Sequence, residues 1–461
     1  MPKITIVGAG GFVFPLRLIG DLLSFPALRE SELCLMDIDA DRLNEVADAA
    51  QQVIDHHRLG ATVVRTTDRR KALDGADHVI ITFQVGGVAA YRHDVEIPRR
   101  YGVDQTVGDT IGPGGVFRFL RSVSAYDGIA ADLRELSPRA QVINYANPMA
   151  MATWYLNGLG VPTVGLCHSV QNTSRMLADA VEVPYDEVHY RAAGINHQSW
   201  FTEFRRGSED LYPRLREVLV RRHLGSVDSR VDSGAGREVG RLADDHGDHS
   251  DTDRGVNVYE GGQEHVRTQI MDAFGYFHTE SSHHASEYLP YFRKNPSMVR
   301  DFIPQRWDYY EICAAHDPTD HAANLVTKLK QELTPSMEYG ASIVNSIESG
   351  VPSVIYGNVP NHGLVTNLPE DSCVEVACLV DANGVQPTVF GALPPQCAAV
   401  NRTNINVQEL AVAAARTRNR EHVFHAVLND PLTSALLTID QIHSMTEELL
   451  AAHASLLPEG L

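Results

Sequence analysis

Two neighbouring residues in the stretch GLCHSVQN, residues 165–172, could take part in metal chemistry. Cys167 and His168 follow an apolar run, and a later apolar run ends in GINH at His197. A closed structural zinc site usually takes four such ligands, so Cys167 and His197 alone are too few for one. Two ligands suit a catalytic cation completed by substrate oxygens and water. The spacing alone leaves a second interpretation open, in which Cys167 is a buried small residue and His197 caps a turn.

A histidine-rich stretch, DDHGDHSDTD at residues 244–253, also has the composition of a ligand cluster. It contains no apolar residue that could anchor it to a core. We therefore expect a solvated, mobile loop here rather than a metal site.

A glycine-rich turn near the start indicates a dinucleotide site. GAGG closes the first apolar run, and Gly8 and Gly10 match the first two glycines of the dinucleotide fingerprint, although Val13 stands at the third position. The acidic sequence MDIDAD ends the second run and places Asp37 where a ribose 2'-hydroxyl is bound, which favours NAD over its phosphorylated form. The alternative is a similar sheet that binds no nucleotide.

The elements that must position these residues alternate regularly in the N-terminal third. Apolar runs at residues 4–7, 33–36, 78–83, 142–145 and 164–167 are followed by helical spacing, for example at 41–53. This pattern predicts an α/β fold with a doubly wound parallel sheet. The motif NYANP then places Asn147 at the carboxyl edge of the sheet, where ligands bind, although Asn-Pro is also ordinary turn punctuation.

The C-terminal part has a different pattern. Residues 354–365 and 373–388 alternate strand-like runs with turns, which predicts a β meander packed against helices, and residues 407–457 are helical and Ala/Leu-rich. That helical tail could serve a subunit interface or the core. We expect a nucleotide-binding domain at 1–190 and an α+β substrate, metal and oligomerisation domain at 191–461.

Composition excludes several classes of partner. The 39 Lys and Arg against 59 Asp and Glu give a net charge of −20, which disfavours nucleic acid and anionic membranes. The chain enters strand-like sequence at once, and no stretch approaches 18 unbroken apolar residues. Six scattered cysteines suit reduced thiols. We expect a cytoplasmic protein.

Several motifs in a fixed order carry a resemblance. The motifs are, in chain order, GAGG, DTIGPGGVFR (109–118), NYANPMA, GLCHSV, AGINH, TESSHH with EYLPYF, and YGNV with CLVDANGVQPT. Together they resemble glycoside hydrolase family 4, from about residue 3 to 455. The match is closest to the family's melibiase-like α-galactosidases. The resemblance implies a lactate/malate dehydrogenase-like Rossmann domain followed by an α+β catalytic domain.

The resemblance also implies a mechanism that departs from the usual pair of carboxylates. Nicotinamide takes a hydride from C3 of the sugar, the ketone acidifies the C2 proton, a base removes it, the aglycon is eliminated, water adds and the hydride returns. The implied cofactors are NAD and Mn²⁺, the substrate is a small α-glycoside, and the assembly is a homodimer or homotetramer.

The motifs assign roles to residues of this chain. Cys167 and His197 match the metal ligands, and His168 beside them is a candidate for leaving-group protonation, substrate choice or hydrogen bonding. Asp109 is a candidate general acid or sugar-hydroxyl binder, and the C2 base is His284 or Tyr288. The implied cofactor residues are Gly8, Gly10, Gly11, Phe12, Asp37 and Asn147, and the implied substrate residues are Asn147, Arg118 and Asn196.

One residue departs from the family pattern. Melibiase-like relatives have Pro-Ser-Arg-Glu-Tyr where this chain has Met337 in place of the arginine. Loss of a cation there could change the tolerated C6 substituent or aglycon. α-Glucosides, α-glucuronides, α-galacturonides and sulfoquinovosides therefore remain open substrates, and a lactate/malate-type dehydrogenase remains an alternative activity.

Overall fold

The computed structural model describes residues 1–231, 264–315 and 318–461. Its strands are β1 Lys3–Val7, β2 Glu32–Met36, β3 Thr62–Thr66, β4 His78–Ile81, β5 Gln141–Asn144, β6 Thr163–Gly165, β7 Val188–Ile195, β8 Gln198–Arg206, β9 Glu209–Asp210, β10 Phe277–His278, β11 Ser353–Pro360, β12 Cys373–Asp381 and β13 Gly384–Pro387. Its α-helices are α1 Val13–Ser24, α2 Ala40–His57, α3 Arg69–Leu73, α4 Gly87–Tyr101, α5 Gly112–Leu136, α6 Met149–Gly158, α7 Ser169–Ala180, α8 Tyr212–Val231, α9 His265–Phe274, α10 Ser282–Ala285, α11 Pro296–Phe302, α12 Tyr309–Ala315, α13 Pro318–Gln331, α14 Tyr339–Ser349, α15 Pro395–Thr417, α16 Arg420–Leu428, α17 Pro431–Leu436 and α18 Ile439–His453.

The parallel half of the sheet has the strand order β3-β2-β1-β4-β5-β6. This is the order of a doubly wound dinucleotide-binding fold, and it confirms the predicted fold class. The strand β3 was not predicted, because it lies at the sheet edge, mostly solvent-exposed, and carries no buried apolar run.

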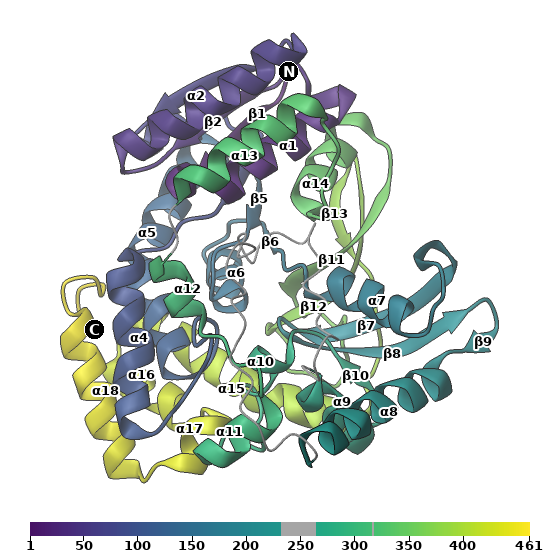
Figure 1. Ribbon diagram of the computed structural model, residues 1–461. Helices are drawn as coiled ribbons and strands as arrows, with labels where there is room; N and C mark the ends of the chain where they lie inside the picture. Colours follow the sequence, from purple (N-terminus) through teal and green to yellow (C-terminus); the bar gives the residue numbers. More distant parts are fainter. Residues whose placement is uncertain (232–263, 316–317) are drawn as a thin grey trace.

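The sheet continues without interruption into an antiparallel half. Strand β11 pairs with β6, and the strands β12, β7, β8 and β10 follow in that order (Figure 1). Strands β11 to β13 form the predicted meander. Strand β7 spans the expected domain boundary between residues 190 and 191, so the two expected domains share one sheet, and their division stays a prediction.

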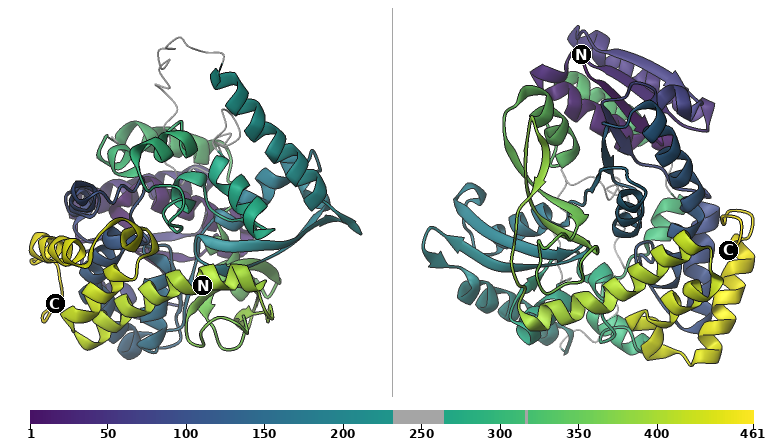
Figure 2. Two further views of the ribbon diagram at one scale, coloured as in Figure 1. Left: turned by 90° about the horizontal axis from the view of Figure 1, so that it is seen from below. Right: turned by 180° about the vertical axis from the view of Figure 1, so that it is seen from behind.

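Helices from distant parts of the sequence cover the parallel half. Helix α1 packs against α2, α13 and α14, although α13 begins at residue 318. The packing there is close, because a Cβ atom on Gly20 would lie 2.4 Å from a terminal methyl of Leu329, which would have to shift. The tail helices α15 to α18 pack against α4, α5 and α6, as Figures 1 and 2 show. The tail therefore contributes to the core of its own chain.

None of the described helices combines the length and the apolar character that a bilayer span requires. All six cysteines are free thiols, and five of them are buried.

One row of paired residues crosses the sheet just below its functional edge. The row runs through Met36, Val7, Ile81, Asn144, Gly165, Asn358, Glu375, Gly194 and Ser199. Asp37 and Gly8 follow this row directly, and Cys167 follows Gly165 by two residues. The sheet register therefore brings the candidate cofactor and metal residues to one edge.

Candidate active site

The glycine turn after β1 leaves no room for side chains. Gly8 has a φ of 96°, and a Cβ atom there would lie 2.5 Å from the backbone nitrogen of Phe83. A Cβ atom on Gly10 would lie 2.8 Å from the carboxyl carbon of Asp37. Instead, the Gly10 amide donates a 2.8 Å hydrogen bond to Asp37. Both glycines therefore let the turn pack closely against Phe83 and Asp37, and they match the first two glycines of the dinucleotide fingerprint.

The end of the turn aims the first helix at the same edge. Gly11 is exposed, and Phe12 adopts a positive φ of 53° immediately before α1 begins. The first amides of α1 point toward this edge, where a helix N-terminus favours an anion. Asp37 is half-buried, and its two carboxylate oxygens accept hydrogen bonds from the Gly10 amide at 2.8 Å and from the Asp39 amide at 3.0 Å.

A second group of polar side chains lies after β5. Asn147 donates a hydrogen bond of 3.0 Å to Asp109, and the Arg118 guanidinium lies 3.7 Å from the same carboxylate. Arg118 also donates to the Asn147 carbonyl at 3.3 Å and to the Gln84 side chain at 3.1 Å. Asp109 is 2% exposed and Arg118 8%, so this ion pair is held in a low-dielectric environment.

Cys167 and His197 meet, and Glu280 joins them. One ligand atom from each of the three residues lies within 4.8 Å of the others. The His197 Nε2 atom is 3.4 Å from the Glu280 carboxylate. The Cys167 thiol donates to the Ser169 hydroxyl at 3.3 Å. A thiol, an imidazole and a carboxylate are all recognised ligands for divalent transition metals.

The backbone is strained at two of these residues. His197 lies in the two-residue turn between β7 and β8 with a φ of 61°, and Glu280 has a φ of 76°. Each costs roughly 1–2 kcal/mol relative to a right-handed conformation. Such strain concentrates at functional sites, where the fold holds a side chain in a fixed direction. Beside His197, the buried side-chain amide nitrogen of Asn196 has no hydrogen-bond partner among the described residues, which leaves a donor for a ligand.

His168 faces a buried carboxylate. Its Nδ1 atom lies 3.2 Å from Glu338, whose side chain is 2% exposed. Burial by itself lowers the pKa of His168, but the charge of Glu338 outweighs it and raises this pKa to about 10. The histidine side chain is 32% exposed while Nδ1 is buried, so the accessible edge of the ring lies away from Glu338.

The two candidate bases share one network with His197. The Tyr288 hydroxyl donates to Thr110 Oγ1 at 3.0 Å and lies 3.4 Å from His197 Nδ1. The His284 ring lies 4.8 Å from the His197 ring, and its Nε2 atom is 2.6 Å from the same Thr110 hydroxyl. Its Nδ1 atom is 2.9 Å from Glu287, so both nitrogens of His284 have partners.

The ionisation of the cluster follows from burial and charge. Burial raises the pKa of Glu280, but the charges of His197 and His284 outweigh it and lower this pKa to about 2. Burial raises the pKa of the Cys167 thiol to about 12 and that of the Glu375 carboxyl to about 7. Without a cation the cluster therefore holds an ionised carboxylate beside a protonated thiol.

The structure brings all the residues predicted for the site to one edge of the sheet and adds acids that the sequence analysis did not assign. Those acids are Glu280, Glu287, Glu338 and Glu375. Glu280 and Glu287 lie in the motifs TESSHH and EYLPYF, Glu338 follows Met337, and Glu375 lies in the strand-like run at 373–388. Their contacts cross between segments far apart in the chain, so no local spacing could identify them.

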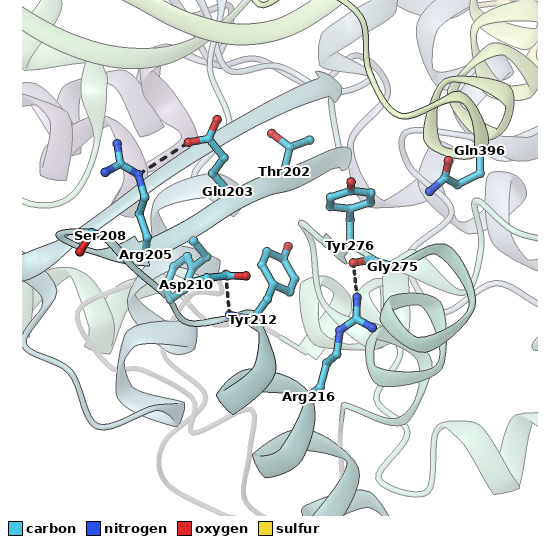
Figure 3. Close-up of a pocket in the computed structure, with 11 residues that line it drawn as sticks. Thr202, Glu203, Arg205, Ser208, Asp210, Tyr212, Arg216, Gly275, Tyr276 and Gln396 are labelled. Atoms are coloured by element: carbon cyan, nitrogen blue, oxygen red, sulfur yellow. Dashed lines mark hydrogen bonds and ion pairs between the residues drawn. The ribbon is translucent and has the colours of Figure 1, made fainter.

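Two other features lie away from this edge. The histidine-rich stretch at 244–253 falls outside the described residues. A separate hollow of about 560 Å³ lies by β8, β9 and the start of α8, where Tyr212, Arg216 and Tyr276 contribute to its wall (Figure 3). The residues that line it include none of the candidate site residues.

Comparisons with known proteins agree along the whole chain. The chain is 37% identical to an α-galactosidase of Bacillus subtilis, over 100% of both chains. It is 34% identical to an α-galactosidase of Rhizobium meliloti, over 99% of this chain and 89% of the relative. In fold it is similar to a 6-phospho-α-glucosidase from gut microorganisms solved with NAD and Mn²⁺, with a TM-score of 0.73, 19% identity and 99% of each chain covered.

Two family descriptions match in succession. Residues 3–183 match "Family 4 glycosyl hydrolase", and residues 192–433 match "Family 4 glycosyl hydrolase C-terminal domain". The two matches contain the glycine turn, Asp37 and Cys167 on one side and His197 and Glu280 on the other. With a glycine turn, a Cys-His-Glu cluster and full-length relatives in agreement, the chain belongs to the family 4 glycosyl hydrolases.

Proposed function

We propose that this chain hydrolyses α-galactosides with NAD and a divalent cation, Mn²⁺, as cofactors. The observation that carries the proposal is the placement of Cys167, His197 and Glu280 at the same sheet edge as the glycine turn and Asp37. The names of the two relatives, both α-galactosidases, support the substrate.

The residues of the glycine turn fit NAD. Gly8 and Gly10 stand at the first two glycine positions of the dinucleotide fingerprint, and a Cβ atom at either would strike Phe83 or Asp37 and disturb the turn that meets a pyrophosphate. Asp37 offers a carboxylate to ribose hydroxyls and repels a 2'-phosphate. We assign Gly11 and Phe12 to the same turn and Asn147 to the nicotinamide end.

The donor set fits a divalent cation. His197 Nδ1 faces the Tyr288 hydroxyl, so Nε2 on the Glu280 side is the ligand atom. Cys167 would have to lose its proton on binding, which makes metal affinity rise with pH. The Glu280 carboxylate adds a hard ligand to the softer thiol and imidazole, which suits Mn²⁺ better than cysteine and histidine alone.

The glycine turn and Asp37 would hold NAD, which would supply a reversible hydride acceptor, and Cys167, His197 and Glu280 would hold a cation, which would supply a Lewis acid for the sugar hydroxyls. The chain's own residues orient the sugar around this chemistry. Asp109, Asn147 and Arg118 present a hydrogen-bonded set for sugar hydroxyls, and the Asn196 amide supplies a further donor. Burial of this set keeps water from competing with the sugar.

A base must remove the C2 proton. Both nitrogens of His284 have partners in Thr110 and Glu287, so His284 is suited to holding the network in place. The geometry favours Tyr288, whose hydroxyl lies beside the ligand His197. Burial raises the pKa of Tyr288 well above its usual value, and a nearby cation would have to lower it again. The ionised Glu280 carboxylate is the second candidate.

The leaving group must receive a proton as the aglycon departs. His168 carries one, and its accessible edge lies away from the buried Glu338. We assign His168 to leaving-group protonation. Asp109 then serves a sugar hydroxyl, because its carboxylate is already bound to Asn147 and close to Arg118.

A panel of aryl α-glycosides with NAD and Mn²⁺, run with and without chelator, tests the proposal. We expect α-galactosides to be cleaved fastest, chelator to abolish turnover, and substrates deuterated at C2 and C3 to react more slowly. Preference for an α-glucoside, a uronide or a sulfoquinovoside would assign the same mechanism to another sugar and implicate Met337. Stoichiometric release of reduced cofactor would instead indicate a lactate/malate-type dehydrogenase.

We also propose a homodimer or homotetramer, which light scattering on the purified protein tests directly. The cytoplasm is the compartment we propose, because the reaction depends on a supply of NAD. Fractionation of the producing cells tests that assignment.

A further inference from the structure

Glu375 is a fully buried carboxylate with no part in the mechanism above. It lies on β12, where it pairs with Asn358 on β11 and Gly194 on β7. Its exposed fraction is 0%. A buried carboxylate costs several kcal/mol unless neighbours compensate it, so its position calls for a reason.

On one side, Glu375 connects to the segments that carry His197 and Glu280. The Ser199 hydroxyl donates to the Glu375 carboxylate and lies 3.2 Å from the Ile195 carbonyl, which closes the turn that holds His197. The Ser199 backbone exchanges bonds of 2.9 and 3.0 Å with Thr279, the residue before Glu280.

On the other side, Glu375 connects to the strand that carries Cys167. The Asn358 amide donates to Glu375 at 3.1 Å and reaches the Gly165 carbonyl at 3.5 Å. Gly165 ends β6 two residues before Cys167. A glycine packs closely here, because a Cβ atom would lie 2.2 Å from the Met149 sulfur and 2.5 Å from the Thr153 hydroxyl oxygen, and both side chains would have to shift.

We propose that Glu375 is a positioning residue for the metal site, holding the strand ends of Cys167, His197 and Glu280 in register and placing a carboxyl group close to the cation. The inference rests on the proposed function, because it concerns the same cation. It adds an outer layer to the site, since groups that orient metal ligands tune affinity without touching the metal.

The substitution Glu375→Gln keeps the shape of the side chain and removes its charge. Metal-free protein is titrated with Mn²⁺ while the electron paramagnetic resonance signal of free Mn²⁺ is followed. We expect the dissociation constant to rise about 10- to 100-fold. We also expect the melting temperature of the metal-free variant to stay equal or to rise, because the variant no longer buries a carboxylate.

A weaker Mn²⁺ affinity without a lower melting temperature distinguishes a positioning role from a merely structural one. In a merely structural role, a lower melting temperature would accompany any loss of affinity. Asp430→Asn is the matched control, since Asp430 is a buried acid that caps α17 and should leave Mn²⁺ affinity unchanged. If Glu375→Gln does not fold, Ser199→Ala takes its place and should raise the dissociation constant several-fold at an unchanged melting temperature.

Two results would overturn the inference: wild-type Mn²⁺ affinity in the variant, or a loss of Mn²⁺ affinity that merely tracks a lower melting temperature. Either result would leave the proposed function standing. Failure of the wild-type protein itself to bind Mn²⁺ would remove the proposed metal and this inference together.

Discussion

Replacing Glu287 by glutamine should destabilise the loop that leads to Asp109. The fully buried Glu287 carboxylate accepts backbone hydrogen bonds from Thr106 at 2.6 Å, Val107 at 2.7 Å and Gly108 at 3.0 Å. The Glu287 carboxylate therefore accepts hydrogen bonds from three backbone amides that point toward it. A glutamine amide would turn its own NH₂ group toward at least one of them and leave a buried donor unsatisfied.

The pKa of Glu287 gives the magnitude. Burial raises this pKa, but the charge of His284 and the hydrogen bonds outweigh it and lower it from 4.5 to about 2. That difference corresponds to about 3 kcal/mol, since one pKa unit is worth about 1.4 kcal/mol. Because the pKa is lower in the folded protein, this stabilisation is complete above pH 4.5 and is lost as the pH falls toward about 2.

Urea unfolding of the metal-free protein measures the effect. At neutral pH we expect the free energy of unfolding of Glu287→Gln to be lower than wild type by about 3 kcal/mol. In acid the difference between the two should shrink. The control is Glu135→Gln, which breaks a pair with Arg70 whose glutamate side chain is 63% exposed. That exposed pair should contribute far less than the buried carboxylate, because solvent screens its charges. If Glu287→Gln costs no more than this control, the reasoning about the buried carboxylate is wrong.

Three further substitutions test the site. Cys167→Ser should abolish metal-dependent turnover while fluorescence titration finds NAD affinity within a few fold of wild type; a parallel loss of NAD affinity would contradict the assignment. Glu280→Gln should weaken Mn²⁺ binding about tenfold or more if the carboxylate is a ligand; lost turnover at full Mn²⁺ affinity would make Glu280 the base instead. Asp37→Asn should weaken NAD binding and reduce the protein's preference for NAD over its phosphorylated form, measured as the ratio of the two dissociation constants; an unchanged ratio would exclude Asp37 from ribose recognition.

Short sequence patterns predicted the strands and turns that depend mainly on the residues within them. The apolar runs at 4–7 and 33–36 became β1 and β2, because buried parallel strands carry continuous apolar residues. The turn at Gly8 was also predictable, since glycine adopts a tight turn at positive φ without the steric cost that other residues carry. The edge strand β3 was missed, because its side chains are only exposed or half-buried and form no continuous buried apolar run.

The sequence by itself determined the fold class, the glycine turn with Asp37, and the proposed pairing of Cys167 with His197 that a family resemblance supplied. Only the tertiary structure decided that Glu280 completes the cluster and that Glu375 lies close to it. The physical reason is distance along the chain. Hydrogen bonds and charges act over a few ångströms in space, and the sheet register, set by pairs such as Glu375 with Gly194, brings together acids that lie far apart in sequence.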